Sequence, residues 1–451
     1  MAAQTPADPL LCIGGMKRLL FVTYYFPPSG GPGVQRSLKF VKYLPEFGWR
    51  PTVLTVRPES ASWPDPDPDS VAEIPEGTLV ERTGAWDPYA LYARLKGRKK
   101  QEVISVGFTG EDGAVPHRRF ARWIRANLFL PDARVGWVPF ATARARALMR
   151  QQYDAVLTTG PPHSTHFAGL ALRRTHGTPW LVDFRDPWTE IDYHADLPMT
   201  GPARALDALL ERQVLRKADG FSVVSASMQR RFAQRGYASE VIENGFDPAD
   251  FEESASSSTV SGDAFVVAHV GNMNRTRNPE ALWKALSAPE TASDWSDLQC
   301  RFTGHVDSSV LASASAFCPG VRLDTLPYVP HRTAIDRMRE AALLLLCINR
   351  VEGAEGIATG KLYEYLASGR PVLALGPVNG DAARILQETG AGRMFDFDDT
   401  DGVRAFLRTH YEAWRAGSPL QGAPPDRIAR YSRREQARQL AALLSGLSEG
   451  S

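Results

Sequence analysis

The sequence predicts an α/β protein made of two doubly wound, parallel-sheet domains in tandem. The chain has 451 residues, more than one ordinary domain contains. Apolar segments of strand length alternate with amphipathic segments of helix length, as in a parallel sheet covered by helices. The alternation stops at the serine-rich stretch EESASSSTVSGD, residues 252–263, and then starts again. Such a stretch is typical of a linker or an exposed loop.

The first half of the chain supplies one complete set of elements. Strands are predicted at Leu19–Thr23, Thr52–Val56, Ala155–Thr159, Trp180–Phe184, Gly220–Val224 and Glu240–Glu243. Helices are predicted between them at Ser37–Phe47, Pro139–Gln152, Ser164–His176, Ala203–Ala218 and Ala226–Arg235. We expect this N-terminal, Rossmann-like domain to span residues 16–250. The extension at 1–15 lacks the basic start and apolar core of a signal peptide.

The second half repeats the pattern. Strands are predicted at Phe265–Val270, Leu298–Thr303, Val321–Leu323, Leu343–Ile348 and Val372–Leu375, with helices at Pro279–Ser287, His331–Glu340, Gly360–Ala367 and Asp381–Gln387. This predicts a C-terminal Rossmann-like domain over residues 251–425. An amphipathic helix within residues 426–451 is expected to pack back on the N-terminal domain. Ligands of open α/β sheets bind at the carboxyl ends of the strands, so we expect the site in the cleft between the domains.

The composition excludes several classes of protein. Lys and Arg (52) nearly balance Asp and Glu (51), which gives no electrostatic basis for binding nucleic acid. No apolar run approaches the roughly 18 residues that a membrane span needs. The four cysteines have no metal-ligand spacing. These features favour a cytoplasmic protein.

The segment YYFPPSGGPGVQR, residues 24–36, joins the first strand to the first helix. A glycine-rich turn before a helix lets the backbone approach an anion. Arg36 occupies the position where a dinucleotide fingerprint needs its third glycine, which argues against an NAD(P)-dependent dehydrogenase. We expect Gly30, Gly31 and Gly33 to lie beside a phosphate or a sugar. The alternative is a purely structural turn.

The segment EGAEGIATGKLYEYLASGRP differs from the phosphate loop of ATPases and kinases. Gly356 and Gly360 enclose only three residues, and Leu362 stands where the magnesium-binding hydroxyl belongs. Lys361 lies in the first turn of a predicted helix, where it opposes the helix dipole unless it faces a bound anion. Glu364, one turn later, is placed to accept bonds from a diol such as ribose. The alternative is an exposed Lys–Glu pair.

Two further segments place polar residues after predicted strands. In HVGNMNRTRNPEALWKAL, Arg275 and Arg277 suit a diphosphate through bidentate contacts, unless they are simply solvated. In TTGPPHSTH and PWLVDFRDPW, the candidates for hydroxyl recognition are His163, Asp183, Arg185 and Asp186. A histidine before a helix is more often a cap than a catalyst. No spacing supports a nucleophile–base triad or a metal cage.

The segment HRRFARWIRANLFLPDARVGW, residues 117–137, alternates arginine with Trp123, Phe129 and Trp137. Together with the basic run RLKGRKK at residues 94–100, it predicts a surface that rests on anionic lipid. The alternative is an ordinary solvated helix face.

Taken in order, these segments resemble the glycosyltransferases of family 4, a retaining class with the GT-B fold. The resemblance runs from about Met16 to the final helix. Its motifs are YYFPPSGGPGVQR, PDARVGW, TTGPPHSTH, DFRDPW, ENGFD, GNMNRTRN and GKLYEYLASGRPVL. It implies that the Gly30–Gly31 loop approaches a nucleotide-sugar donor.

The resemblance also implies roles for residues of the second domain. Arg277 stands at the family's lysine position, while Asn272 replaces its arginine and leaves Arg275 as a substitute. Lys361 is expected at the phosphate and Glu364 at the ribose. The family's second glutamate corresponds to Gly356, so backbone N–H groups of three consecutive residues are expected to contact the donor sugar: Gly356, Ile357 and Ala358.

The implied function is retaining transfer of a sugar from a nucleotide diphosphate donor to an acceptor hydroxyl. A carbohydrate or lipid-linked acceptor is expected, in cell-surface polysaccharide or glycolipid synthesis, with peripheral contact to the inner face of the membrane and neither metal nor other cofactor. Arg277 and Lys361 are the predicted catalytic residues. The predicted acceptor-binding residues are His163, Arg185, Asp186, Asp132 and Trp137. The alternatives are a UDP-sugar 2-epimerase-like enzyme and a non-catalytic nucleotide-sugar binding protein.

Overall fold

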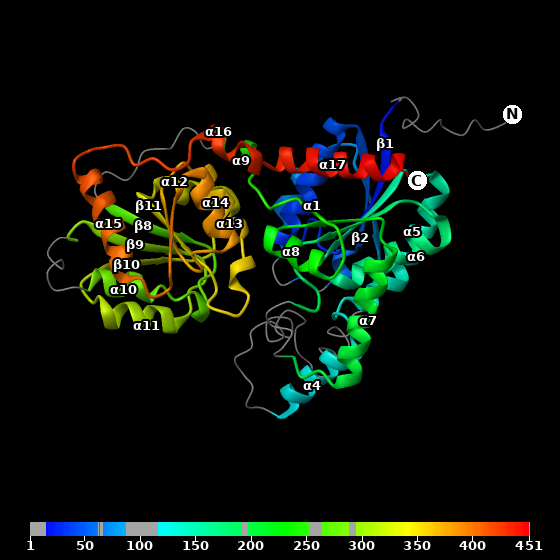
Figure 1. The fold of residues 1–451 in the computed structure, drawn as a ribbon, viewed down its shortest axis with the longest axis horizontal. Helices are drawn as coiled ribbons and strands as arrows, with labels where there is room; N and C mark the ends of the chain where they lie inside the picture. The colour runs from blue at the N-terminus through cyan, green and yellow to red at the C-terminus, as the bar shows by residue number, and fades with distance from the viewer. Residues whose placement is uncertain are drawn as a thin grey trace. The chain divides into compact units, whose positions relative to one another are not determined.

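The chain divides into two compact units, shown as a computed structural model in Figure 1. The structure describes residues 15–61, 63, 66–86, 116–190, 197–252, 264–287 and 295–450. Unit 1 contains the described residues up to Val224, Phe232–Ile242 and Ala437 onward, and unit 2 contains Ser225–Arg231 and those of Glu243–Gln436. The extension at 1–14, the basic run at 94–100 and most of the serine-rich stretch (253–263) lie outside the described residues.

Unit 1 is built on a parallel sheet with the strand order β3-β2-β1-β4-β5-β6-β7. Its strands are β1 (Lys17–Val22), β2 (Trp49–Val56), β3 (Leu79–Thr83), β4 (Ala155–Gly160), β5 (Trp180–Phe184), β6 (Gly220–Val223) and β7 (Glu240–Val241). Its helices are α1 (Pro32–Tyr43), α4 (Pro116–Leu128), α5 (Val138–Leu148), α6 (His166–His176) and α7 (Gly201–Lys217). Two more helices, α8 (Ala226–Gln234) and α17 (Arg433–Glu449), contribute residues to both units.

One core cluster of unit 1 lies between its sheet and the helices α1 and α17. Alternate side chains of a strand point to the same face, so Leu19 and Phe21 of β1 share one cluster. Leu38 of α1 and Leu440 of α17 are buried in the same cluster. The last helix of the chain therefore packs on the sheet formed by the first residues, although more than 400 residues separate them.

Unit 2 is built on a second parallel sheet, with the order β10-β9-β8-β11-β12-β13. Its strands are β8 (Phe265–Val270), β9 (Leu298–Thr303), β10 (Arg322–Leu326), β11 (Leu343–Cys347), β12 (Val372–Leu375) and β13 (Gly392–Phe395). Its helices are α9 (Pro248–Glu252), α10 (Glu280–Leu286), α11 (Ser308–Phe317), α12 (His331–Glu340), α13 (Gly360–Ala367), α14 (Asp381–Thr389), α15 (Thr400–Arg415) and α16 (Pro425–Ile428).

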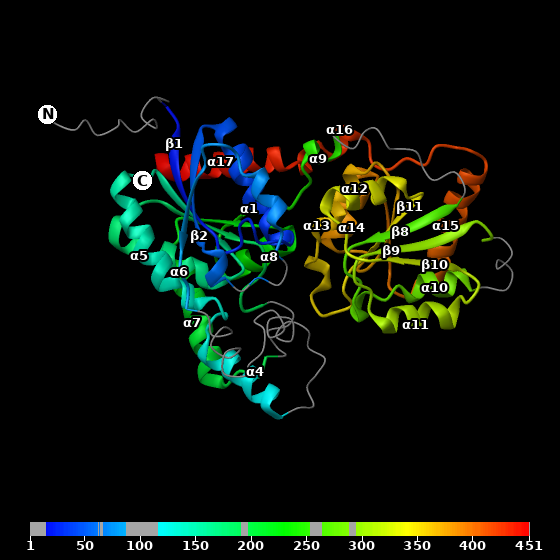
Figure 2. The ribbon, with the colours of Figure 1, turned by 180° about the vertical axis from the view of Figure 1, so that it is seen from behind.

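Helices cover both faces of this second sheet (Figure 2). Val266 and Ala268 of β8 pack in a cluster with residues of α13 and α14. Phe265 and Val267, which point the other way, pack in a separate cluster with residues of α10, α11 and α15. A continuous apolar strand such as FVVAHV is what a strand buried on both faces requires.

These sheets confirm the predicted fold class. The bounds of β5, β8, β9, β12, α12 and α13 are those that the sequence predicted. Helix α1 begins at Pro32 rather than Ser37, because Gly31 (φ 91°) leads into the helix and proline suits its first turn. Strand β10 is shifted to Arg322–Leu326, and the edge strands β3 and β13 were not predicted, because they lack long apolar runs.

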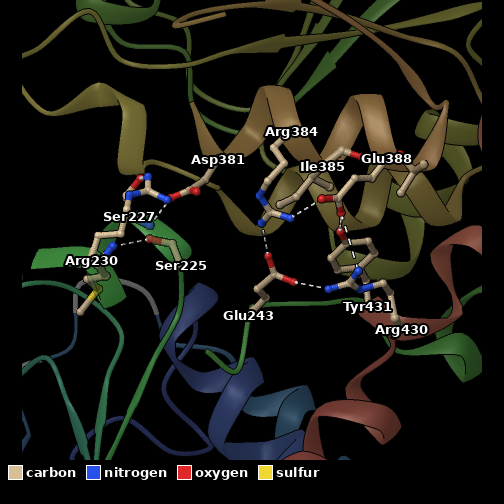
Figure 3. A network of polar contacts seen from close by, with 12 residues as sticks. Ser225, Ser227, Arg230, Glu243, Asp381, Arg384, Ile385, Glu388, Arg430 and Tyr431 are labelled. Carbon is tan, nitrogen blue, oxygen red and sulfur yellow. Dashed lines mark hydrogen bonds and ion pairs between the residues drawn. The ribbon is translucent and has the colours of Figure 1, made fainter. Parts of the chain in front are cut away.

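Helix α14 anchors three chain segments of unit 2 through a polar network (Figure 3). The carboxylate of Asp381 accepts a hydrogen bond from the Ser227 backbone N–H at 3.1 Å. Arg384 lies 2.6 Å from Glu243 and 2.8 Å from Glu388, which in turn accepts from the Tyr431 hydroxyl at 3.0 Å. The segment Ser225–Arg231, which lies just beyond the β6 strand of unit 1, thus belongs to unit 2, and the chain passes into unit 2 again at Glu243.

Each sheet reverses its strand order once, between β1 and β4 in unit 1 and between β8 and β11 in unit 2. Loops that leave neighbouring strands in opposite directions open a crevice at this point, where open α/β sheets bind ligands. The predicted site residues Gly30, Gly31 and Gly33 follow β1, and Arg277 follows β8. Lys361 lies in α13, which follows β11.

Candidate functional site

Lys361 and Arg277 converge at the point where the unit 2 sheet reverses its order. Lys361 Nζ donates to the backbone oxygen of Asn272 at 3.2 Å, and Arg277 Nη1 donates to the same oxygen at 3.1 Å. Arg277 Nε also donates to Asn349 Oδ1 at 2.6 Å, two residues beyond the end of β11. A single carbonyl therefore holds two cationic side chains side by side.

The pKa values of Lys361 and Arg277 indicate that no negative charge among the described residues balances these two cations. Burial, followed by the charge of Arg277, lowers the pKa of Lys361 to about 7. Burial also lowers the pKa of Arg277. Within the described part of the chain, neither cation forms an ion pair with a carboxylate. Two partly desolvated cations without a counter-charge are chemically suited to an anion of more than one charge.

His269, which sequence reasoning missed, supports Lys361 from within the sheet. The ring is buried in β8, with Nε2 3.1 Å from Lys361 Nζ and Nδ1 3.0 Å from the Leu345 oxygen. The adjacent Gly271 has φ 111°, and a Cβ there would lie 2.4 Å from Lys361 Cε. Only glycine lets the lysine side chain cross this turn. The signal in the sequence was a single polar residue in an otherwise apolar strand.

Glu364 lies one turn beyond Lys361 on α13, as the sequence predicted from helical spacing. Its Oε1 accepts a hydrogen bond from His331 Nε2 of α12 at 3.0 Å. No local pattern pairs these residues, because they are 33 positions apart. The bond fixes one carboxylate oxygen of Glu364.

The other residues predicted for donor binding occupy the loops of the same edge: Asn272, Arg275, Gly356, Ile357 and Ala358. Asn272 and Arg275 are exposed, and Gly356 ends a short 3-10 turn (Ala354–Gly356). Thr359 precedes α13, and its hydroxyl is buried without a hydrogen-bond partner among the described residues. An unsatisfied buried hydroxyl at a helix start is a further polar group that a ligand can engage.

In unit 1, Arg185 joins the glycine loop after β1 to the loop after β4. Its Nη1 donates to the Gly33 oxygen at 2.6 Å, and its other nitrogens donate to the oxygens of Gly160 and Pro161. A Cβ on Gly33 would lie 2.5 Å from Nη1, so a larger residue would displace the guanidinium. Arg185 therefore shapes the Gly30–Gly33 loop, and its predicted contact with an acceptor stays a prediction.

Arg36 forms a buried ion pair that local sequence patterns did not reveal. Its guanidinium bonds both carboxylate oxygens of Asp183, at 3.1 and 2.8 Å, and each side chain is 1% exposed. Thr159 and Ser222 each donate to the same carboxylate at 2.8 Å. Although burial opposes it, Arg36 holds the pKa of Asp183 below its usual value. The buried Asp183 carboxylate thus joins α1 to β4, β5 and β6. The prediction that Asp183 binds substrate hydroxyls is therefore wrong.

His163 lies in a buried aromatic cluster next to the same loops. Its ring stacks on Trp188 with centroids 5.0 Å apart and an interplanar angle of 9°. Burial, together with the nearby charge of Arg185, lowers the pKa of His163 to about 3. The imidazole is therefore neutral at physiological pH, so it is suited to hydrogen bonding and unsuited to acting as a protonated acid.

The remaining predicted acceptor residues lie in unit 1, where Asp132 and Trp137 form hydrogen bonds with other residues of that unit. Asp132 accepts hydrogen bonds from the backbone and hydroxyl of Ser164, at 2.9 and 2.8 Å, and so caps the start of the segment that leads into α6. Trp137 is buried and donates to the Thr83 hydroxyl at 2.8 Å. Asp186 follows β5 and is partly buried. Direct contact of these residues with an acceptor stays a prediction.

Two observations on the described residues concern metals and membranes. No group of three or more His, Cys, Asp or Glu side chains among them is placed to hold a metal ion. No helix among them combines the length and apolarity that crossing a bilayer demands. That the reaction needs no metal ion stays a prediction.

Comparisons with known proteins agree with the two-sheet fold. Residues 30–245 match the family described as glycosyl transferase 4-like domain. No curated protein sequence matches the chain. Sucrose-phosphate synthase from Thermosynechococcus elongatus is similar in structure, with a TM-score of 0.60 and 14% identity over 96% of this chain and 100% of that one.

Two other solved structures cover nearly the whole chain. Anabaena HepE, in complex with UDP and glucose, has a TM-score of 0.50 and 14% identity over 96% of this chain and 98% of that one. A putative UDP-N-acetylglucosamine 2-epimerase from Listeria monocytogenes has a TM-score of 0.53 and 12% identity over 97% and 98%. At such identities the likeness shows the fold alone. Residues 30–245 are thus similar to the glycosyl transferase 4-like domain, and the two parallel-sheet units have the GT-B fold.

Proposed function

We propose that this protein is a retaining glycosyltransferase that moves a sugar from a nucleoside diphosphate sugar to an acceptor hydroxyl. The observation that carries the proposal is the pair of partly buried cations, Lys361 and Arg277, held on the Asn272 oxygen without a carboxylate partner in the described part of the chain. In such a transfer, negative charge grows on the departing diphosphate. Donors and cations fixed in advance at that charge stabilise the transition state most effectively.

The donor half of the reaction is assigned to unit 2. Lys361 and Arg277 would bind the diphosphate, and N–H groups at the start of α13 would bind its oxygens or the sugar. Glu364 would accept hydrogen bonds from the ribose diol, with one of its oxygens already fixed by His331. The similar HepE structure holds UDP and glucose, which supports a nucleotide-sugar donor of this kind.

The acceptor half is assigned to unit 1, where His163 and the loops joined by Arg185 would hold the acceptor. Because His163 is neutral, it offers hydrogen bonds to a sugar hydroxyl without adding a charge to the acceptor site. In a retaining transfer the departing phosphate itself accepts the proton of the acceptor hydroxyl as the new glycosidic bond forms. This route needs no separate base from the protein.

A lipid-linked acceptor is supported by the unusual orientation of α7. This helix buries its acidic residues, Asp207 and Glu211, and exposes Leu206 and Leu209 at 47% and 45%. Trp188 donates to Asp207 at 2.9 Å, and Arg235 pairs with Glu211 at 2.7 Å.

The charged residues that α7 exposes are all basic: Arg204, Arg212, Arg216 and Lys217. Leu128, at the end of the neighbouring α4, is 67% exposed. Exposed leucines among arginines suit the surface of an anionic membrane. We therefore propose that the protein contacts the membrane peripherally and acts in glycolipid or cell-surface polysaccharide synthesis.

A panel of UDP-, GDP-, ADP- and TDP-sugars tests the function. Stabilisation by one nucleotide, followed by acceptor-dependent release of it and an unchanged anomeric configuration in the product, is the expected result. The likeness to a putative 2-epimerase favours one second candidate. An epimerised sugar formed without any acceptor would replace the proposal, and nucleotide binding without release would indicate a non-catalytic binding protein.

A further inference from the structure

His269 lies within hydrogen-bond distance of Lys361, and the tautomer of its ring follows from its bond to the Leu345 oxygen. A carbonyl oxygen only accepts, so Nδ1 carries the ring hydrogen that bonds Leu345 at 3.0 Å. Nε2 then has a lone pair and accepts from the Lys361 ammonium at 3.1 Å. Burial and the Lys361 charge lower the pKa of His269 well below its ordinary value, which keeps the ring neutral.

The ammonium group of Lys361 is oriented by two neutral acceptors. One of its three N–H bonds is directed to His269 Nε2 and another to the Asn272 oxygen. Among the described residues these are its hydrogen-bond acceptors, so one N–H is left for a ligand. An aliphatic chain with four rotatable bonds would otherwise lose considerable conformational entropy on binding an anion.

The other groups that act on Lys361 electrostatically do not supply a close counter-charge. Arg277, from the loop after β8, carries a like charge. Cys347, at the end of β11, is a neutral thiol, because burial raises its pKa to about 12. Glu364, on α13 itself, is hydrogen-bonded to His331. A carboxylate in the place of His269 would hold Lys361 equally well but would cancel the charge that attracts the donor.

We propose that His269 is the positioning residue of the donor site: a neutral imidazole that fixes the Lys361 ammonium toward the diphosphate while leaving its charge uncompensated. This role rests on the proposed function only in naming the diphosphate as the ligand. A buried residue of β8 would therefore contribute to donor affinity in addition to its packing in the sheet.

Three substitutions separate positioning from simple packing. His269→Gln keeps an acceptor at the reach of Nε2 and loses the bond to Leu345, whereas His269→Asn keeps the Leu345 bond and loses the acceptor. His269→Glu puts a carboxylate beside Lys361. For each full-length variant, the pKa of Lys361 is measured without ligand by NMR of ¹³Cε-labelled lysine, assigned with Lys361→Met. UDP affinity is measured by calorimetry at pH 8, and the melting temperature is recorded.

We expect His269→Asn to lower the pKa of Lys361 by about one pH unit and UDP affinity by about tenfold, the factor that one unit represents above the pKa. His269→Gln should keep both near the wild-type values. His269→Glu should raise the pKa of Lys361 and still weaken UDP binding, because the ammonium is then neutralised.

If all three variants keep the wild-type pKa of Lys361 and only the melting temperature falls, His269 is a packing residue and the inference is overturned. If the pKa changes as expected but wild-type protein binds no nucleoside diphosphate, the proposed function fails, while the positioning of the Lys361 ammonium by His269 is confirmed. If UDP binds and His269→Asn changes neither pKa nor affinity, the positioning role fails and the proposed function stands.

Discussion

Replacing Lys361 with methionine should make the ligand-free protein more stable while it abolishes donor binding. Methionine keeps most of the length of the lysine side chain and removes its charge. The charge is unfavourable in the free protein, because it is partly buried and lies beside Arg277. A group kept for binding at the expense of stability is the expected signature of a functional site.

The size of the gain follows from the pKa of Lys361, which falls from 10.5 to about 7. At 1.36 kcal/mol per unit, the lowered pKa corresponds to about 5 kcal/mol of lost folding free energy as an upper limit. Loss of the bond to His269 Nε2 removes about 1 kcal/mol of the expected gain in stability, and solvent screening of the Lys361 charge reduces the gain further. We therefore expect Lys361→Met to stabilise the protein by about 2–4 kcal/mol at neutral pH.

The pH dependence of this gain has a definite sign. Because the folded-state pKa lies below the unfolded one, the penalty is complete below pH 7 and disappears as the pH rises toward 10.5. Calorimetric melting at pH 6.5, 8.0 and 9.5 measures it, with Lys217→Met, an exposed lysine of α7, as the matched control. A melting temperature that is unchanged, lowered, or raised equally at all three pH values would refute the reasoning.

Three further predictions follow from the same geometry. UDP affinity should fall as the pH rises above about 7, because the bound diphosphate raises the pKa of Lys361 and binding therefore takes up a proton. Calorimetry between pH 7 and 9.5 measures the affinity, and a flat pH profile would contradict the prediction. Arg36→Met should destabilise the protein by about 3–5 kcal/mol, because it leaves the buried Asp183 carboxylate unpaired, and Asp183→Leu in the same chain should restore much of the loss. Melting curves of the single and double variants decide this. Leu206→Ser with Leu209→Ser should weaken sedimentation with phosphatidylglycerol vesicles about tenfold and leave transfer to a water-soluble acceptor unchanged; equal binding by both proteins would show that α7 is not the contact.

Local sequence patterns were sufficient for most of the fold. The buried strands of unit 2 are readily predicted, because a run such as LLLLC fits a strand covered on both faces. Helix α11 was missed because SSVLASASAF has no clear apolar periodicity, and its start depends on a cap from Asp307. The edge strand β3, LVERT, carries charges that a central strand would exclude.

Site residues could be predicted where they lie in one helix, and could not be predicted where their partners lie on other strands or helices of the sheet. Lys361 and Glu364 were found because three residues of helix place them on one face. The pairing of Arg36 with Asp183 joins positions 147 residues apart, which no local pattern encodes. His269 was overlooked for the same reason: its role is defined by Lys361, 92 residues later.

The interleaved course of the chain limits how such a protein can be recombined with its relatives. An exchange of whole units would need four junctions, at Val224–Ser225, Arg231–Phe232, Ile242–Glu243 and Gln436–Ala437. A single crossover at Ile242 would combine the first sheet with a foreign terminal helix and leave Asp381 facing a foreign partner at position 227. New donor preferences are therefore expected to arise in such chains by point changes around the donor loops more readily than by shuffling of halves.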